Sequence, residues 1–365
     1  MKIADITRFL ETIAPPALQE SYDNCGLLTG SPESQCNGVL VTLDATEAVV
    51  EEAIRRGCNL VVAHHPIIFS GLKKINGKNY VERTVIAAIR NDIALYAIHT
   101  NLDNIAGGVN GRIAERLGLQ SRSILLPKEQ TLRKLYTFVP LAQADAVRNA
   151  LFAAGGGHIG QYSECSFSVA GTGTFTAGEG ANPFVGAIGQ RHEEPELKLE
   201  LVFPGWLQQQ LVAALLEAHP YEEVAYDIVS LSQTQGGIGS GVIGKLPEPL
   251  DPEAFLALLK SQFGSGTIRH TALPKGKVQT VAVCGGAGSF LISKALASGA
   301  DAFVTADLKY HEFFDADGRL LLCDIGHYES EQFTTDLLAE LLQQKFITFA
   351  VLKSDQITNP VYYYF

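Results

Sequence analysis

The sequence predicts an α/β protein in which helices flank mixed, mostly parallel sheets and a ferredoxin-like domain is inserted between them. Two observations support this fold class. Short apolar strands alternate with amphipathic helices in both terminal parts of the chain, as in parallel sheets covered on both faces. Between those parts, residues 131–235 follow the order β-α-β-β-α-β, the split βαβ pattern. The predicted domains are residues 1–130 plus 236–365, and the insert 131–235.

The N-terminal part alternates helix and strand from its first residues. Thr46 is expected to cap a helix, with Glu47 in the first turn, where the helix dipole favours an acid. Asn110 is expected to cap a later helix. The expected elements are helix 3–13, strand 39–43, helix 46–56, strand 60–63, helix 80–90, strand 93–98 and helix 110–117.

The insert and the C-terminal part follow. A stretch rich in glycine and threonine separates the second and third strands of the insert, and residues 233–239 read as its exit linker. The insert is expected to hold strands 135–139, 163–170, 197–203 and 224–231 and helices 145–154 and 206–218. The C-terminal part is expected to hold strands 241–245, 278–283, 302–305 and 320–323 and helices 251–263, 289–297 and 327–343.

Composition limits the classes of function. The chain has 365 residues, which makes two domains the natural expectation, and 28 Lys+Arg against 39 Asp+Glu give a net charge of −11. An acidic surface repels phosphate backbones, so nucleic-acid binding is disfavoured, whereas metal cations are attracted. We expect a protein without membrane-spanning segments, because no apolar stretch of that length is free of charges.

The cysteines and the N-terminus indicate a cytoplasmic protein. The six cysteines are scattered without a C-x-x-C pair, and several lie in apolar, strand-like contexts. Buried reduced thiols explain them better than disulfides or a thiolate zinc site. Residues 1–11 are amphipathic and interrupted by charges, unlike a signal peptide.

Two adjacent histidines end the most apolar predicted strand. His64 and His65 follow the run 60–63, and Pro66 cannot continue a sheet ladder. The imidazoles are thus expected at the carboxyl end of a buried parallel strand, where open α/β sheets place their binding crevices. The alternative is one buried histidine satisfied by hydrogen bonds and one surface histidine.

Three further side chains are expected to join this pair. His327 and Glu331 are four residues apart at the start of a helix, so they project from one face, although a capping acid with a solvated histidine would look the same. Asp103 follows a third apolar strand. All five side chains are expected at the same end of one sheet.

This mixed nitrogen and oxygen set suits zinc, iron or manganese rather than calcium. Five ligands exceed what one tetrahedral ion needs from a protein. We therefore expect two divalent cations per subunit, bridged by a carboxylate and with positions open for water.

Other polar groups lie near the ends of the same strands. Asp307 and His311 form another pair four residues apart, and His99 lies beside the Asp103 loop. All three are candidate catalytic residues, which would orient a ligand or move protons. The alternative is that they are polar residues at helix starts whose hydrogen bonds are made within the fold. The glycine-rich turn 284–289 either holds an anion on backbone N–H groups or is a tight turn that needs glycine.

A family resemblance covers almost the whole chain. The matching motifs are Ser-Tyr-Asp-Asn-Cys-Gly at 21–26, Ala-His-His-Pro at 63–66, His-Thr-Asn-Leu-Asp at 99–103, Thr-Ala-Asp at 305–307 with His311, and Gly-His at 326–327 with Glu331. In the insert they are residues 157–163, 171–175 and 218–223. The chain resembles the GTP cyclohydrolase 1 type 2 homolog family, also called Nif3-like, in its long bacterial form with a PII/CutA-like insert.

The resemblance implies a ligand assignment. His65 and Asp103 would bind one metal, His64 and His327 the other, and Glu331 would bridge them. It also implies a homohexameric ring, with a trimer of dimers as one arrangement and the insert capping the ring. Many members have Thr-Gly-Asp where this chain has Thr-Ala-Asp; the Ala306 methyl should be tolerated unless that glycine needs a positive φ.

These patterns predict a dinuclear divalent-metal protein that acts as a metal-dependent hydrolase on a nucleotide-like or phosphorylated small molecule. The alternative is a non-catalytic, metal-containing regulatory or scaffold ring that binds a partner, an effector or DNA. Whether the chain is an enzyme stays open at this point.

Overall fold

A computed structural model describes residues 1–364. The chain divides into two compact units: residues 1–126 with 237–364 form the first, and residues 127–236 form the second. The first unit contains two sheets of mixed strand direction, and the second contains a four-stranded sheet. The predicted mixed α/β class is confirmed.

The first sheet has the strand order β1-β4-β3-β2-β15. Its four strands β15, β2, β3 and β4 are parallel, and β1 is antiparallel at the edge. The bounds are β1 Gly26–Thr29, β2 Val39–Asp44, β3 Leu60–His65, β4 Ala94–Ala97 and β15 Val351–Lys353. The helices in the N-terminal part of the chain are α1 Ile3–Ile13, α2 Glu47–Arg55, α3 Tyr80–Arg90, α4 Thr100–Asp103 and α5 Val109–Arg116. Helix α11, Thr334–Lys345, packs against β2 and β15, whereas α5 packs against the second sheet of this unit.

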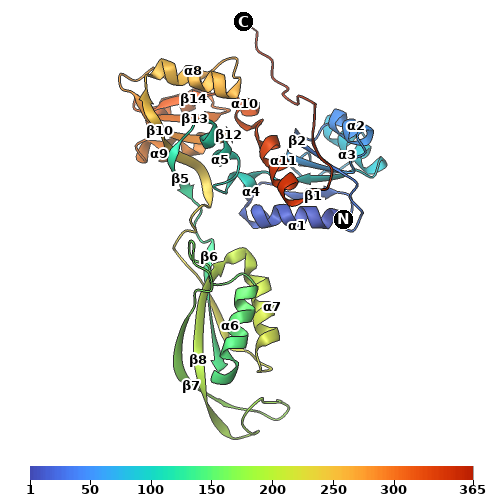
Figure 1. The fold of residues 1–365 in the computed structure, drawn as a ribbon, viewed down its shortest axis with the longest axis vertical. Coiled ribbons are helices and arrows are strands. Elements are labelled where there is room, and N and C mark those ends of the chain that lie inside the picture. The colour runs from blue at the N-terminus through green and yellow to red at the C-terminus, as the bar shows by residue number, and fades with distance from the viewer. Residues whose placement is uncertain (365) are drawn as a thin grey trace. The chain divides into compact units, whose positions relative to one another are not determined.

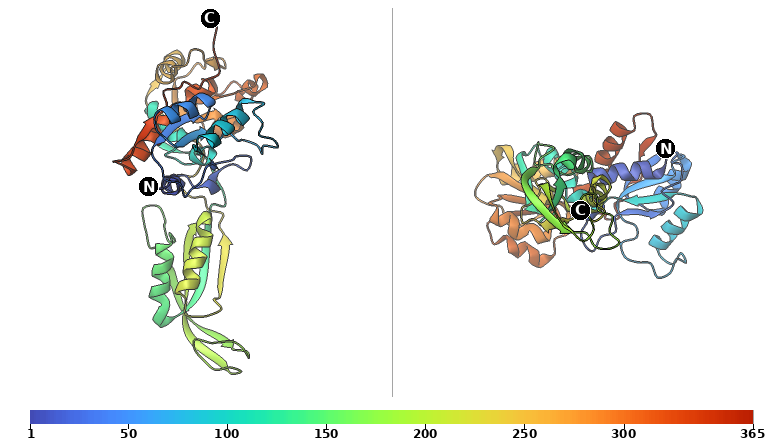
Figure 2. Two further views of the ribbon diagram at one scale, coloured as in Figure 1. Left: turned by 90° about the vertical axis from the view of Figure 1, so that its right-hand side faces the viewer. Right: turned by 90° about the horizontal axis from the view of Figure 1, so that it is seen from below.

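The second sheet has the order β11-β14-β13-β12-β10-β5, and β12, β13 and β14 are parallel. Its strands are β5 Gln120–Pro127, β10 Gly239–Leu250, β11 Arg269–His270, β12 Val278–Ala287, β13 Ala302–Ala306 and β14 Leu321–Asp324. The helices are α8 Pro252–Phe263, α9 Ile292–Ala297 and α10 His327–Glu331. The end-on view in Figure 2 separates the blue N-terminal elements of this unit from the orange C-terminal ones.

The two sheets of the first unit share one hydrophobic core. Along β3, Leu60 and Val62 face this shared core, whereas Val61 faces a second cluster beneath α2 and α3. On the other sheet, Val281 and Val304 contribute to the shared core. Successive strand residues thus bury both faces, which explains why these strands read as continuous apolar runs.

The second unit is the insert. Its elements are β6 Leu132–Pro140, α6 Ala144–Ala153, β7 Phe167–Thr176, β8 Arg191–Pro204, α7 Gln208–Ala218 and β9 Tyr226–Ser230, and the sheet order is β7-β8-β6-β9. Both helices pack on one face of the sheet, over Leu135, Leu199 and Leu201 (Figure 1). The expected order β-α-β-β-α-β is present.

Several local predictions are confirmed. Thr46 caps α2 by accepting a hydrogen bond from the Val49 N–H at 3.4 Å, and Glu47 lies in the first turn of that helix. All six cysteines are free thiols. Within residues 1–364, no helix is long and apolar enough to cross a membrane.

Three expectations were wrong. The strands expected in one sheet belong to two, because β2 pairs with β15 and β3, and β3 pairs with β4, whereas β12–β14 lie in the other sheet. Asn110 does not cap α5; Gly108 takes that position, and Asn110 lies inside the helix. The glycine- and threonine-rich stretch lies largely within β7, whose pairing with β8 continues to Thr176, so both strands are longer than their apolar runs.

Strand β3 should be sensitive to the loss of core volume. Leu60 is fully buried on it, so Leu60→Ala should lower the free energy of unfolding by about 2–5 kcal/mol through lost burial and a residual cavity. Ile54→Ala on α2 is the control, because Ile54 is 43% exposed and its truncation should cost no more than about 0.5 kcal/mol. Chemical denaturation of both variants measures the difference, and equal costs would contradict the packing described.

Candidate metal centre

The predicted site residues meet where the strands of the two sheets end. His64 and His65 are the last two residues of β3, and Asp103 lies in α4, directly after β4. His327 and Glu331 begin and end α10, which follows β14 of the other sheet. Two sheets therefore contribute to one cluster at their carboxyl ends.

His64 is fully buried, and its orientation is set by the backbone. Its Nδ1 lies 2.8 Å from the carbonyl oxygen of Ile98, so Nδ1 carries the proton and donates it. The lone pair of Nε2 then points at Asp103, whose Oδ1 is 3.7 Å away. Both atoms are buried without a hydrogen-bond partner, and a bound cation would satisfy them together.

His65 and His327 are held in the same way by carboxylates. Nδ1 of His65 is 2.7 Å from Asp44 Oδ1, and Nδ1 of His327 is 2.7 Å from Asp307 Oδ2. The two Nε2 atoms are 3.3 Å apart and lie 2.9 and 3.0 Å from Glu331 Oε2. Metal-binding histidines characteristically have the second ring nitrogen anchored by such oxygen acceptors.

Burial and the neighbouring carboxylates shift the pKa values of the three histidines. Burial lowers the pKa of His64 to about 3. Burial opposes the charged forms of His65 and His327, but hydrogen bonds to their carboxylate partners outweigh it and raise their pKa values to about 10 and about 11.

The two buried carboxyl groups shift in opposite directions. Burial and the charge of Glu331 raise the pKa of Asp103. Burial also disfavours ionised Glu331, but hydrogen bonds from His327 and His65 prevail and hold its pKa well below the usual range. Protons on two imidazoles therefore balance the Glu331 carboxylate, and an ion bound there would replace them.

His99 is a fourth imidazole in the cluster. Its Nδ1 is 2.8 Å from Asp23 Oδ1, and its ring centroid lies 5.2 Å from that of His64 and 5.4 Å from that of His65. One ligand atom from each of these three histidines lies within 4.8 Å of the others, as does one from each of His65, His327 and Glu331. The structure thus contains two groups that could hold a metal ion.

The other two candidate catalytic residues, Asp307 and His311, lie in different surroundings. Asp307 orients His327, and it has a left-handed backbone with φ 57°, which aspartate tolerates better than most residues. Ala306 has no positive φ, so the alanine fits, as expected. His311 is exposed and packs against the rings of Tyr310 and Phe314, and it does not line the cavity described below.

The glycine-rich turn 284–289 lets the Glu331 side chain lie close to the backbone. Gly286 has φ +59°, and a Cβ at this position would lie 2.5 Å from Glu331 Oε1. Its N–H donates to Ser330 Oγ at 3.0 Å. Asn110 joins this turn to the Asp103 loop, since its side chain accepts from the Gly285 N–H and donates to the Asp103 carbonyl. These contacts place Glu331 between the contributions of the two sheets.

The sequence patterns missed the groups that orient the imidazoles. Asp23 and Asp44 had no predicted role, although Asp44 follows an apolar strand as Asp103 does and was accessible to the same rule. Asp23 accepts from the Thr100 N–H and the Cys25 thiol as well as contacting His99, so its side chain is held from several directions. Its position emerged only from the fold.

A cavity of about 800 Å³ opens beside these side chains. Within the described residues, Arg269 is the only Lys or Arg among those that line it, and it contacts the Leu308 carbonyl and the Asp324 carboxylate. Aromatic rings on its walls are those of Tyr22, Phe69, Phe290, Tyr328 and Tyr363.

The Asp307 carboxylate should matter for metal affinity without touching the metal. Asp307→Asn should weaken binding of zinc or manganese by about 10–100-fold, because the charged acceptor that orients the His327 ring is replaced by a weaker, neutral amide. Asp315→Asn is the matched control, since Asp315 is exposed on the neighbouring 3₁₀ helix, Tyr310–Ala316. Metal titration by calorimetry compares them, and equal affinities would contradict this role.

Metal binding should release protons and tighten with pH. His65 and His327 have pKa values of about 10 and about 11, so both are protonated at neutral pH, and an ion must displace those protons. The apparent affinity should therefore rise with pH up to about 11, the higher of the two pKa values. Calorimetry in buffers of different ionisation enthalpy measures the protons released, and a release of none would count against these imidazoles as ligands.

Comparisons with known proteins agree with the motifs. The family model described as Duf34/NIF3 (NGG1p interacting factor 3) matches residues 1–360. A GTP cyclohydrolase 1 type 2 homolog from Halalkalibacterium halodurans is 40% identical over 99% of both chains, and one from Bacillus subtilis is 38% identical over 97% of this chain and 96% of its own. The crystal structure of a Bacillus cereus protein related to NIF3 superimposes with a TM-score of 0.86 at 37% identity, covering 100% of this chain and 99% of that one. The chain belongs to the Duf34/NIF3 family.

Proposed function

We propose that the chain is a dinuclear metal-dependent hydrolase that acts on a nucleotide-like or phosphorylated small molecule. The observation that carries this proposal is the common orientation of three imidazoles. His64, His65 and His327 each have Nδ1 fixed by an oxygen acceptor and Nε2 directed into the cluster. The residues present therefore fit a divalent cation such as zinc, iron or manganese.

Glu331 supports a pair of ions rather than one. Its Oε2 lies beside the Nε2 atoms of His65 and His327, and its Oε1 is 4.0 Å from Nε2 of His64, on the side of Asp103. The shortest distances join His64 with Asp103 and His65 with His327, whereas the resemblance pairs them the other way. The division of these four side chains between two ions stays a prediction, with Glu331 as the bridge in both versions.

A bound pair of ions would supply hydroxide near neutral pH and stabilise the attacking and leaving oxygens of a displacement. The chain itself provides a positioned proton carrier. Asp23 holds Nδ1 of His99, which leaves the His99 Nε2 to accept or donate a proton beside His64 and His65.

The cavity walls support the class of substrate. Arg269 can face an anionic group, and the aromatic side chains can pack against a flat ring such as a base. The relatives carry the name GTP cyclohydrolase 1 type 2 homolog, which agrees with a nucleotide-like substrate and hydrolytic ring opening.

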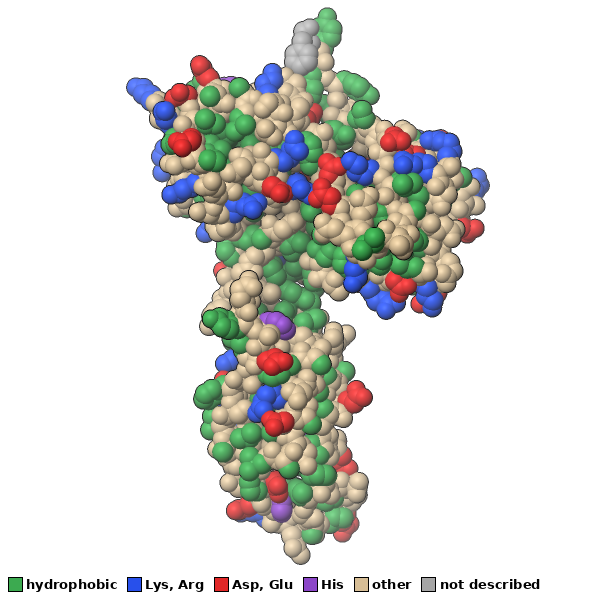
Figure 3. Space-filling view, viewed as in Figure 1, with side chains coloured by type: hydrophobic (Ala, Val, Ile, Leu, Met, Phe, Trp, Pro, Cys, Tyr) green, Lys and Arg blue, Asp and Glu red, His purple; other side chains and the backbone are tan. Residues whose placement is uncertain are grey.

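We also propose that the insert is a PII/CutA-like domain and that the chain forms a homohexameric ring with an effector or substrate as its small-molecule partner. The strand order β7-β8-β6-β9 and the family motifs in the insert support the PII/CutA-like assignment, whereas the ring rests on the family resemblance alone. Nucleic acid is a less suitable partner, given the net charge of −11; Figure 3 shows Lys and Arg mixed with Asp and Glu over the visible face of the first unit.

Removing a ligand should remove both metal and turnover. Metal-loaded protein is assayed on a panel of nucleotides and phosphoesters, and metal content is measured by elemental analysis of the same sample. His64→Ala and Glu331→Gln should each lower the bound metal and reduce any turnover by at least about 100-fold, because coordination is lost.

Exposed residues of the same types supply the controls for this experiment. His158→Ala and Glu253→Gln should leave metal content and turnover unchanged, and circular dichroism should show all four variants folded. Wild-type protein that retains stoichiometric metal but turns over no member of the panel would contradict the hydrolase and favour a regulatory or scaffold protein.

A further inference from the structure

The insert contains a cavity of its own, of about 730 Å³. It is formed by strands β6, β7 and β8, the loop that follows β7, and residues 221–225 after α7. In the register of the sheet, Phe175 lies opposite His192 and Gly171 lies opposite Glu196, on the face away from α6 and α7. None of its lining residues is shared with the cavity of the metal cluster.

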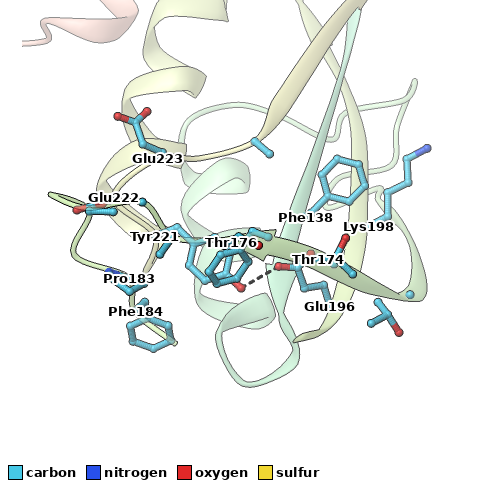
Figure 4. A pocket seen from close by; sticks show the side chains of 18 of the residues that line it. Phe138, Thr174, Thr176, Pro183, Phe184, Glu196, Lys198, Tyr221, Glu222 and Glu223 are labelled. Carbon is cyan, nitrogen blue, oxygen red and sulfur yellow. Dashed lines mark hydrogen bonds between the residues drawn. The ribbon is translucent and has the colours of Figure 1, made fainter. Parts of the chain in front are cut away.

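A buried carboxylate lies in this cavity. Glu196 is only 7% exposed, and its Oε1 accepts a hydrogen bond from the Tyr221 hydroxyl at 2.8 Å (Figure 4). Its side chain lies flat on the strand beside Gly173, where a Cβ would be 2.2 Å from Oε2. Within residues 1–364, Oε2 has no hydrogen-bond partner.

Tyr221, the donor to Glu196, is held in place by a hydrogen bond of its own backbone to His219. His219 is buried and donates from Nε2 to the Phe138 carbonyl at 2.9 Å, while its Nδ1 accepts from the Tyr221 N–H at 3.1 Å. Burial, together with the adjacent Glu196 carboxylate, raises the pKa of Tyr221, so its hydroxyl keeps its proton. The Tyr221 hydroxyl therefore donates to Oε1 of Glu196, whose side chain lines the cavity.

The walls around this carboxylate are aromatic. The rings of Phe175 and Phe184 each lie 6.2 Å from that of Tyr221, and Phe138 lines another side. The faces of aromatic rings attract a cation that comes within about 6 Å of the ring centroid, through their quadrupoles. Figure 4 shows Tyr221 and Glu196 adjacent at the centre of the cavity, with Phe184 on one side and Phe138 on another.

No cation of the chain balances the charge. Within the described residues, Glu196 forms no ion pair with a Lys, Arg or His side chain. Lys198 lines the cavity, but its Nζ lies over the ring of Tyr136 and 4.0 Å from Glu200. Glu222 and Glu223 at the rim add negative charge. A buried carboxylate is normally paired, so a ligand is the remaining source of positive charge.

We propose that this cavity binds a small organic cation with an apolar, ring-sized body and a protonated amine. The ammonium donates to Glu196 Oε2 and the body packs against Phe175, Phe184 and Tyr221. The volume lies within the range of small-molecule sites, and one buried polar anchor in an apolar pocket is their usual composition. This binding site is independent of the metal cluster and of the hydrolase proposed above.

Three probes of similar size and different charge test the proposal on the full chain: 2-phenylethylamine, 2-phenylethanol and 3-phenylpropionate. Calorimetry or ligand-observed NMR should show the amine binding at least about 10-fold more tightly than the alcohol, as expected for a charge-assisted hydrogen bond, and the carboxylate binding most weakly.

Two substitutions test whether the Glu196 carboxylate selects the amine. Glu196→Gln keeps the shape and removes the charge, and Gly173→Ala places a methyl where the carboxylate lies. Each should abolish the preference for the amine over the alcohol. Glu193→Gln is the control, because Glu193 is exposed on the same strand and does not line the cavity, so the preference should persist.

Several results would overturn the proposal. Equal binding of amine and alcohol to the unaltered protein would show that Glu196 does not select charge. Preferred binding of 3-phenylpropionate would assign the cavity to an anion held by Lys198. Binding of no probe, as when a second copy of the chain closes the cavity, would also refute it, and this result does not depend on the folding of any variant.

Discussion

The arrangement of the candidate metal centre depends on one repeated interaction, the hydrogen bond that holds Nδ1 of each imidazole. His64 uses a backbone carbonyl, whereas His65, His327 and His99 use carboxylates from three different segments. In each case the acceptor determines which nitrogen faces the cluster. The lone pairs can converge only because these acceptors are in place, so the loops that supply them are as necessary as the histidines.

Both sheets of the first unit supply such acceptors. The acceptors for His65 and His327 are Asp44, at the end of β2, and Asp307, immediately after β13. Each histidine therefore has its carboxylate on a neighbouring parallel strand of its own sheet. Glu331 lies between them because Gly286, on β12, leaves no Cβ in its way. Buried residues of both sheets pack in one shared core, and the cluster lies where strands of the two sheets end.

The sequence predicted most of the elements and the five principal side chains of the site, because both follow from local patterns. A buried apolar run ending at His64-His65-Pro66 and a helix carrying His327 and Glu331 are visible without knowledge of the fold. The division into two sheets is not, since it depends on pairings such as β2 with β15 between residues some 310 positions apart. Asp23 was missed for the same reason: its contact with His99 joins two loops whose proximity is set only by the tertiary structure.

The two cavities illustrate opposite ways of satisfying buried carboxylates. In the first unit, Glu331 is surrounded by imidazoles that can carry protons or yield them to a cation, so its charge is balanced in either condition. In the insert, Glu196 has a neutral tyrosine as its hydrogen-bond donor, which stabilises the carboxylate without neutralising it, and aromatic rings line the space beside it. A site of the first kind suits a metal ion, whose binding can displace protons. A site of the second kind suits a ligand that brings its own positive charge, which is why the two units are assigned different ligands although both are built around a buried glutamate.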